Sequence, residues 1–327
     1  MARASRFART ILIVAATGAA FAAWGQNYPA KPLRMVVPWP PGGANDILGR
    51  ELAEHMSRLT GQQVIVDNRG GANGVIGAEA VARAAPDGYT FMMHSLTSHA
   101  TNPSIFKKLS YDTINDYAPI TQVASVPLMI VTHPSFPAKT VRELVQLAKA
   151  KPGSISYASF GTGSMSHLAG ELLNVMAKID MTHVPYKGGG PALIDTVAGQ
   201  VPVYFAGVTT ALSNVQAGRL RALAVTGSVR SKPLPAVPTV AETLELKGYE
   251  ASVTYAAWAP ARTPPDTIAR LNNVIIKAMQ TPEFRARLDR EGCSDPIGGS
   301  PETLAAVLRS EIDKLAKIVK AAGIEPQ

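Results

Sequence analysis

The sequence has 327 residues, of which 46% are hydrophobic and 17% are charged, with one cysteine and a formal net charge of +8. A chain of this length can bury a large core in one or two domains, and its apolar content excludes a disordered protein. The single cysteine excludes an internal disulfide framework and any cysteine-rich zinc or iron–sulfur site.

The N-terminal segment predicts an export signal. Three arginines within residues 1–9 precede an apolar run over residues 11–23, which is short for a membrane span, and small residues suit cleavage near Gly25. An uncleaved membrane anchor is the alternative. Without residues 1–25 the chain keeps 29 basic and 24 acidic side chains, a net charge of +5. No block of five like charges occurs, so we expect an exported protein that does not bind nucleic acid.

Strands and helices alternate in the first part of the expected mature chain. Apolar runs bounded by turn residues predict strands over residues 33–37, 63–67 and 89–94. Asp46 is expected to cap a helix that runs to about Leu59, and a short helix is expected over residues 75–84. This alternation predicts βαβ units and a parallel sheet.

A long extended stretch over residues 116–132 interrupts the alternation, which then restarts. We expect helices over residues 140–150, 165–178 and 191–198, strands over 154–158, 181–184, 201–205, 219–225 and 251–259, and a helical tail over 264–280, 282–291 and 301–322.

The fold class predicted is therefore α/β, with two lobes joined by two hinge strands and a ligand cleft between the lobes. The tail is expected to return to the first lobe. The predicted boundaries are a signal peptide over residues 1–25, a discontinuous first lobe over 26–122 and 251–327, and a second lobe over 123–250.

Glycine- and hydroxyl-rich loops follow several of the predicted strands, at the edge where α/β sheets bind ligands. Glycines let backbone N–H groups approach a ligand, and a helix N-terminus attracts an anion. The plain alternatives are strand–helix connectors and a solvated lysine. The candidate binding residues in these loops are Trp39, Pro41, Gly42, Gly43, Ala44, Asn45, Asp46, Asn73, Ser95, Thr97, Ser98, Thr162, Gly163, Ser164, His167 and Lys187.

The local motifs of catalytic and cofactor sites are missing from the sequence. The loop over residues 160–167 matches neither G-x-G-x-x-G nor G-x-S-x-G, and the six histidines form no H-E-x-x-H pattern. We expect no cofactor and no metal. A triad assembled across the chain stays open, so an exported hydrolase that uses Ser164 or Ser95 is the alternative to a binding protein.

Several motifs together resemble the Bug-type extracytoplasmic solute receptors of tripartite tricarboxylate transporters. They occur in order and extend over essentially the whole expected mature chain. They are VPWPPGG at 37–43 with Asp46 and Arg50, VDNR at 66–69 with Gly74 and Ile76-Gly77, APDGYT at 85–90, TNP at 101–103, YAS at 157–159, GTGS at 161–164, HLAGEL at 167–172, THVPYKG at 182–188 and GQV at 199–201.

The resemblance implies a type II periplasmic binding protein fold that closes on its ligand, and it implies no enzymatic activity. It further implies a small carboxylate held by amides, hydroxyls and bridging water, with first-lobe contacts from the loop over residues 39–46 and from 95–98. Second-lobe contacts would come from Thr162, Gly163 and Ser164, with His167 and Lys187 as further candidates. The implied partner is the membrane permease of such a transporter; a sensory receptor without a permease is the alternative, and a monomer is the default state.

Two positions depart from the family pattern. Trp39 replaces a smaller aromatic residue and can form a wall for an aromatic ring. Ala206 lies in a segment that lacks an acidic residue often present in the family, where an acid would suit a ligand ammonium group. We therefore hypothesise a dicarboxylate or an aromatic carboxylate rather than an amino acid.

Overall fold

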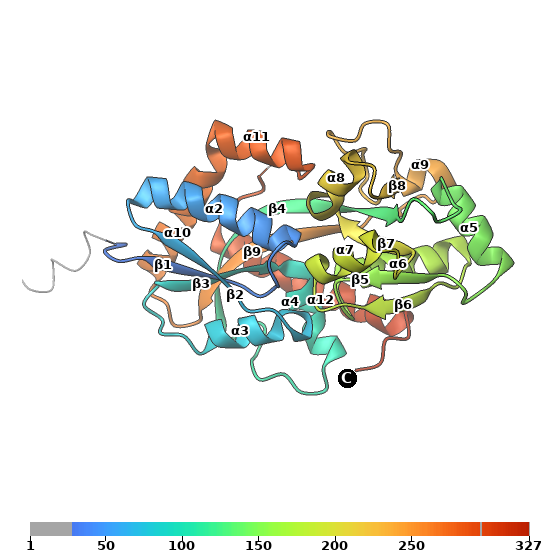
Figure 1. The fold of residues 1–327 in the computed structure, drawn as a ribbon. Coiled ribbons are helices and arrows are strands. Elements are labelled where there is room, and N and C mark those ends of the chain that lie inside the picture. Colours follow the sequence, from blue (N-terminus) through green and yellow to red (C-terminus); the bar gives the residue numbers. More distant parts are fainter. Residues whose placement is uncertain (1–27, 295, 327) are drawn as a thin grey trace, which may run out of the picture.

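The computed structural model describes residues 28–294 and 296–326, and its strands form a nine-stranded sheet with helices packed on both sides (Figure 1). The strand order is β2-β1-β3-β9-β4-β7-β5-β6, and β8 pairs with β4 outside this path. The strands are β1 (Leu33–Val37), β2 (Val64–Asn68), β3 (Thr90–Ser95), β4 (Tyr117–Thr132), β5 (Ser156–Ser159), β6 (Thr182–Pro185), β7 (Val203–Gly207), β8 (Arg221–Val225) and β9 (Ser252–Pro260).

The helices follow most of the predicted spans, with three additions. They are α2 (Ala44–Thr60), the 3₁₀ turn η2 (Ala72–Gly74), α3 (Val75–Ala82), α4 (Leu96–Ile105), α5 (Val141–Ala150), α6 (Met165–Ala177), α7 (Gly189–Val197), α8 (Val208–Gln216), α9 (Val240–Leu244), α10 (Pro265–Gln280), α11 (Pro282–Glu291) and α12 (Pro301–Ala321). Helices α4, α8 and α9 were not predicted, and the residues after β3 that we expected to be a loop begin α4 instead.

The sheet is mixed, and the parallel pairing expected for the first three strands is confirmed. Strands β1, β2 and β3 are parallel to one another, and so are β5, β6 and β7, but every pair that includes β4 or β9 is antiparallel. The first part of β4, up to Pro127, pairs with β9, whereas Leu128–Thr132 pair with β7 and β8. The long strand β4 thus passes from one half of the sheet into the other, and the halves form the two lobes (Figure 1).

The C-terminal helices return to the first lobe. Helix α10 packs on α2 and β4, and α12 packs on α4 and β4. The Asn272 side chain donates a hydrogen bond to the Ile120 carbonyl at 2.8 Å, and the Ser294 amide donates to the Ser125 carbonyl at 2.8 Å. These contacts place the tail beside residues that precede it by more than 150 positions.

The largest cluster of buried apolar side chains includes residues of both lobes and of β4 and β9, and two smaller clusters complete the described core. Trp258 of β9 is fully buried against the ring of His99, whose centroid lies 4.9 Å away. Cys293 is also buried, and its burial raises the pKa of the thiol above its usual range. A buried thiol held in its protonated form is a poor nucleophile, so Cys293 acts as a packing residue.

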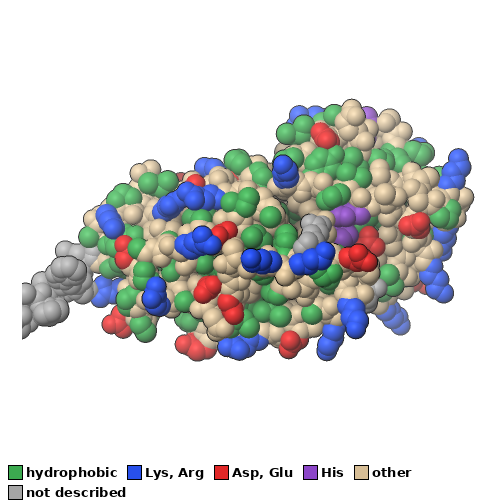
Figure 2. All heavy atoms as spheres, turned by 90° about the horizontal axis from the view of Figure 1, so that it is seen from below, with side chains coloured by type: hydrophobic (Ala, Val, Ile, Leu, Met, Phe, Trp, Pro, Cys, Tyr) green, Lys and Arg blue, Asp and Glu red, His purple; other side chains and the backbone are tan. Residues whose placement is uncertain are grey.

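The predicted export signal lies outside the described residues. Among residues 28–294 and 296–326, none of the helices combines the length and the apolar character needed to cross a bilayer. Lysine and arginine side chains are interspersed with acidic ones on the face in Figure 2, and they form no single-sign field over it.

Candidate functional site

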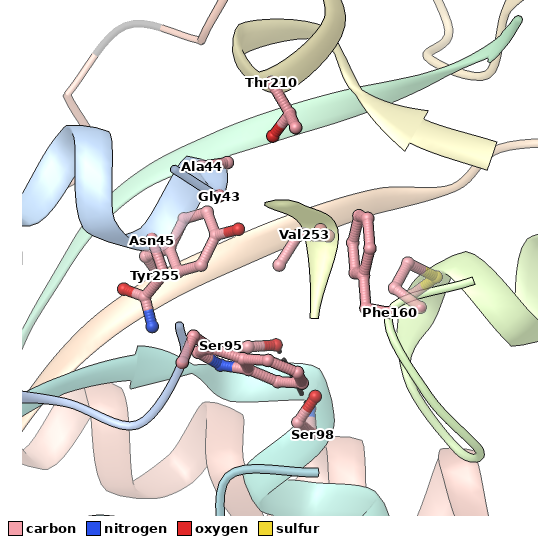
Figure 3. A pocket seen from close by; sticks show the side chains of 12 residues that line it. Gly43, Ala44, Asn45, Ser95, Ser98, Phe160, Thr210, Val253 and Tyr255 are labelled. Atoms are coloured by element: carbon pink, nitrogen blue, oxygen red, sulfur yellow. Dashed lines mark hydrogen bonds between the residues drawn. The ribbon is translucent and has the colours of Figure 1, made fainter. Parts of the chain in front are cut away.

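A cavity lies between the two lobes, where α2, α4 and α8 begin (Figure 3). Its empty space is about 380 Å³ when the solvent at its mouth is included. The part in which the centre of a water molecule fits without touching the protein is about 20 Å³. The lining residues come from both lobes and from β9; they are Trp39, Gly43, Ala44, Asn45, Ser95, Ser98, Phe160, Met165, Gly189, Thr210, Val253 and Tyr255. The lobes therefore enclose a narrow site, mostly apolar and with a few polar groups.

Helix N-termini from both lobes converge on this cavity. Gly43, Ser95 and Gly207 are the N-cap residues of α2, α4 and α8. A Cβ atom built on Gly207 would lie 3.4 Å from the Cβ of Ala44, so the starts of α2 and α8 are neighbours. The amides of a first helical turn have no partner within the helix and carry part of the helix dipole. The site therefore favours an anion even though none of the residues that line it is Lys or Arg.

Polar side chains at these helix starts keep their hydrogen-bonding capacity. Neither amide atom of Asn45 has a partner among the described residues, although the residue is only 3% exposed. The hydroxyls of Thr209 and Thr210 in the first turn of α8 are also buried and have no hydrogen-bond partner among the described residues. Buried polar groups are nearly always hydrogen-bonded in folded proteins, so these groups suit a polar molecule in the cavity.

Asp46 braces the first loop and does not face the cavity. Its carboxylate accepts hydrogen bonds from the Gly42 amide and the Asn68 side chain, both at 3.0 Å, and pairs with Arg50 at 2.9 Å. Burial opposes ionisation, but the bonds from Arg50, Gly42 and Asn68 outweigh it and lower the pKa of Asp46. The helix begins at Ala44 with Gly43 as its N-cap, which corrects the prediction that Asp46 is the cap.

We expect Asp46→Ala to lower the free energy of unfolding by about 1–3 kcal/mol, because the Gly42 amide and the Asn68 side chain lose a charged acceptor. Urea denaturation at pH 7 measures this change. The matched control is Glu54→Ala on the same helix, which removes an exposed pair with Arg58 and should cost less than about 1 kcal/mol. Equal losses for the two variants would contradict the bracing role of Asp46.

Trp39 forms part of the cavity wall, and a hydrogen bond to His94, which does not line the cavity, holds its indole in place. Its indole Nε1–H donates to His94 Nδ1 at 3.3 Å, and the two rings lie 6.1 Å apart. His94 is fully buried; burial first, and then the nearby His99, hold its pKa well below the usual value. The neutral ring can therefore accept the hydrogen bond from the indole N–H. Gly74 makes room for this ring, since a Cβ there would lie 2.3 Å from His94 Cε1.

The loop before α6 is organised by its own hydrogen bonds and by one bond between the lobes. Ser164 is the N-cap: its hydroxyl donates to the Gly161 carbonyl at 2.6 Å and accepts the His167 amide at 3.4 Å. The Gly163 amide donates to His167 Nδ1 at 3.1 Å, and its carbonyl accepts the Thr101 hydroxyl of α4 at 3.0 Å. His167 therefore acts on this loop through Gly163 rather than by lining the cavity.

A pair of histidines, the buried His167 and the half-buried His183, lies behind that loop. His167 and His183 stack with their ring centroids 3.7 Å apart, and Ser159 Oγ lies 2.6 Å from His183 Nε2. The sequence analysis did not find this serine–histidine contact. Ser159 is fully buried, so a substrate carbonyl cannot approach its hydroxyl.

The remaining predicted residues surround the cavity without lining it. Pro41 and Gly42 are exposed at the tip of the first loop, Thr162 is half-buried, and Lys187 is exposed just before α7. Asn73 and Thr97 are buried behind the cavity wall, where Asn73 Nδ2 donates to Asn102 Oδ1 at 2.9 Å. Ala206 is fully buried in β7.

Six lining residues were not predicted from the sequence: Phe160, Met165, Gly189, Thr210, Val253 and Tyr255. Phe160, Met165 and Gly189 lie inside loops that were predicted, over residues 160–167 and 186–191, but were not selected because the prediction favoured hydroxyl, amide and charged groups. Thr210 lies on a helix that was not predicted, and Val253 and Tyr255 lie on a hinge strand, which gave no local signal. Within the described ranges, no group of three His, Cys, Asp or Glu side chains is placed to hold a metal ion.

Two α/β lobes that enclose a cavity at their helix N-termini define a two-lobed solute-binding protein of the periplasmic binding protein class. The profile of the Tripartite tricarboxylate transporter family receptor matches residues 48–324, and the chain belongs to this family. Both the resemblance and the fold class expected from the sequence are thereby confirmed. The family is one of solute receptors.

Individual relatives agree with this assignment. Protein BugT of Bordetella pertussis is 36% identical over 313 residues, covering 95% of each chain. The structure of R. palustris Rpa4515 with adipate is 33% identical with a TM-score of 0.88, covering 92% of this chain and 100% of that one. MatC from Rhodopseudomonas palustris with bound malate is 31% identical with a TM-score of 0.82, covering 89% and 100%.

Proposed function

We propose that this protein is a periplasmic receptor that captures a small organic carboxylate and delivers it to the permease of a tripartite tricarboxylate-type transporter. The observation that carries the proposal is the convergence of the starts of α2, α4 and α8 on a narrow cavity, where the side chains of Asn45 and Thr210 have no hydrogen-bond partner among the described residues. The adipate and malate complexes of two relatives support a carboxylate. We favour a dicarboxylate or an aromatic carboxylate.

Binding would act through closure of the lobes. The ligand contacts both lobes at once, so it stabilises the closed arrangement over the open one, and the permease recognises the closed form. The proposed first lobe comprises residues 26–122 and 251–327, and the proposed second lobe comprises residues 123–250. We propose that the receptor acts as a monomer without a cofactor and without nucleic acid, and that the mature chain begins after Gly25.

The contacts of the candidate serines favour binding over hydrolysis. The Ser164 hydroxyl donates its hydrogen bond to the Gly161 carbonyl. Ser95 Oγ caps α4 and accepts the Ser98 amide at 3.2 Å. Both serines thus serve as helix caps, and their hydrogen bonds go to backbone groups. We expect no turnover of a panel of carboxylate esters.

Thermal unfolding in the presence of candidate ligands tests the proposal. A carboxylate that binds only the folded protein should add about 3 kcal/mol of stability at one hundred times its Kd. The panel contains benzoate, adipate, malate, aspartate and glutamate, with benzamide as the uncharged control. Stabilisation by none of the carboxylates, or by benzamide as strongly as by benzoate, would contradict the proposal.

An uptake assay distinguishes a transport receptor from a sensory receptor. Cells that lack the gene should lose uptake of the radiolabelled ligand if the receptor feeds a permease. Unchanged uptake together with a lost transcriptional response would instead favour the sensory alternative.

A further inference from the structure

Three aromatic rings from separate parts of the chain border the cavity. Trp39 follows β1 in the first lobe, Phe160 follows β5 in the second lobe, and Tyr255 belongs to the hinge strand β9. Phe160 and Tyr255 lie on opposite sides of the pocket with Val253 between them, and the Tyr255 hydroxyl points toward its centre (Figure 3). Lobe closure therefore brings aromatic surface to the ligand from several directions.

Of the helix starts at the cavity, those of α2 and α8 have no side-chain cap, whereas Ser95 caps α4 and accepts its Ser98 amide. The starts of α2 and α8 adjoin each other and bring Asn45 and Thr210 to the site. The side chains of Ala44, Met165 and Val253 are apolar, and none of the lining residues is Lys, Arg, Asp or Glu. Converging helix N-termini can balance one carboxylate. A second carboxylate among the apolar residues would be a desolvated charge without a cation, which is costly.

Trp39 is a rigid wall rather than a hydrogen-bonding group. It is only 7% exposed, and its single polar atom is already occupied by His94. A Cβ built on Gly188 in the second lobe would lie 3.7 Å from Trp39 Cε3, so the indole also meets the opposite lobe. An indole fixed on both sides offers a flat surface that discriminates by ring shape.

From this arrangement we propose that the ligand is an aromatic monocarboxylate, with its carboxylate at the starts of α2 and α8 and its ring among Trp39, Phe160 and Tyr255. This inference rests on the proposed function and selects between the two ligand classes named there. Trp39 and Phe160 are its specificity-determining residues, and His94 is a positioning residue that holds the indole.

Calorimetric titration of the purified protein tests the ligand class. The probes are benzoate, its saturated analogue cyclohexanecarboxylate, the dicarboxylates adipate and malate, and benzamide. We expect benzoate to bind at least about tenfold more tightly than each of the others, since ring contacts and charge are both needed. Tightest binding of adipate or malate, or equal binding of benzoate and cyclohexanecarboxylate, would overturn the inference and leave the proposed function intact. Binding of no carboxylate would overturn the proposed function itself.

Variants test the residues named. Trp39→Leu and Phe160→Leu should each weaken benzoate binding about tenfold, whereas Trp39→Phe, which keeps a ring, should recover most of the affinity. The matched control is Phe136→Leu, which removes a half-buried ring from the second lobe away from the cavity and should change affinity less than about twofold. Melting temperatures show which variants stay folded. If folded Trp39→Leu and Phe160→Leu bind benzoate like the wild type, the aromatic wall does not select the ligand.

Discussion

Gly190→Ala is expected to weaken ligand binding about 10- to 100-fold while leaving the ligand-free protein at least as stable as the wild type. Gly190 lies in the first turn of α7, and a Cβ there would lie 2.8 Å from the Pro41 carbonyl oxygen. Pro41 belongs to the loop between β1 and α2, so this contact joins the two lobes. The obstacle is backbone, which cannot turn away as the end of a side chain can.

The substitution weakens ligand binding but does not destabilise the free protein, because the first effect arises with the lobes closed and the second with the lobes open. An overpacked contact costs about 1–3 kcal/mol, but only when the lobes are closed, and this cost opposes the state that the ligand selects. In the open state the same substitution replaces glycine by alanine inside a helix, which favours the helix by up to about 1 kcal/mol. Loss of affinity combined with a retained melting temperature therefore identifies a closure contact rather than a folding defect.

Titration calorimetry with any ligand that binds the wild type measures the affinity, and calorimetric scans of the free protein measure its stability. The control is Gly218→Ala in the second lobe. Gly218 is exposed with a φ of +69° and has nothing within 4 Å of a built Cβ, so the variant bears backbone strain without an inter-lobe clash. It should lose some stability and keep its affinity. An unchanged affinity for Gly190→Ala would show that the Pro41–Gly190 contact is not part of the ligand-bound state.

The sequence predicted the elements whose own residues decide their structure. The apolar runs before the glycine loops form β1, β5 and β7, and the amphipathic tail forms α10 and α12. Helix α4 escaped prediction because its sequence, LTSHATNPSI, is rich in weak helix formers and contains Pro103. The Ser95 cap and the burial of its side chains hold it in place, and neither is visible in local propensity.

The site shows the same division. Loops with glycines and hydroxyls indicated the residues from Trp39 to Asn45, together with Ser95 and Ser98, because free amides at a helix start have a recognisable sequence pattern. Phe160 and Tyr255 are about 95 positions apart and meet Trp39 only through sheet topology. The mixed sheet had the same cause: the antiparallel pairing of β4 with β9 joins residues more than 120 positions apart, and no local pattern encodes that pairing.

Acid is expected to destabilise the protein steeply between about pH 6.5 and pH 4.5. Burial lowers the pKa of His99 and of His167 to about 4, and burial together with the neighbouring His167 lowers that of His183 to about 3. The pKa of His94 is also well below its usual value. Glu171 lies 3.8 Å from His167 Nε2 and favours the charged ring, but burial outweighs this attraction.

The sign follows from proton uptake. Below pH 6.5 these histidines bind protons in the unfolded chain but stay neutral in the folded chain. Each of them therefore lowers the free energy of unfolding by about 1 kcal/mol for each unit by which the pH falls. Asp46 and Asp67 have lowered pKa values, so the stability they add is present above pH 4 and is lost only below it. With a total stability of about 5–15 kcal/mol, four such histidines can unfold the protein before Asp46 and Asp67 are protonated.

Urea unfolding at half-unit pH intervals measures this slope and hence the number of protons taken up. His99 provides the sharpest test, because its Nε2 bonds the Thr113 carbonyl at 3.2 Å and its buried Nδ1 has no partner within the described part of the chain. Its ring packs among Tyr111, Tyr117 and Trp258, where phenylalanine can fit. His99→Phe should therefore reduce the uptake by about one proton and flatten the acid branch, even if it lowers stability at pH 7. A wild-type slope near zero from pH 6.5 to pH 4.5 would mean that the histidines open to solvent before the fold is lost.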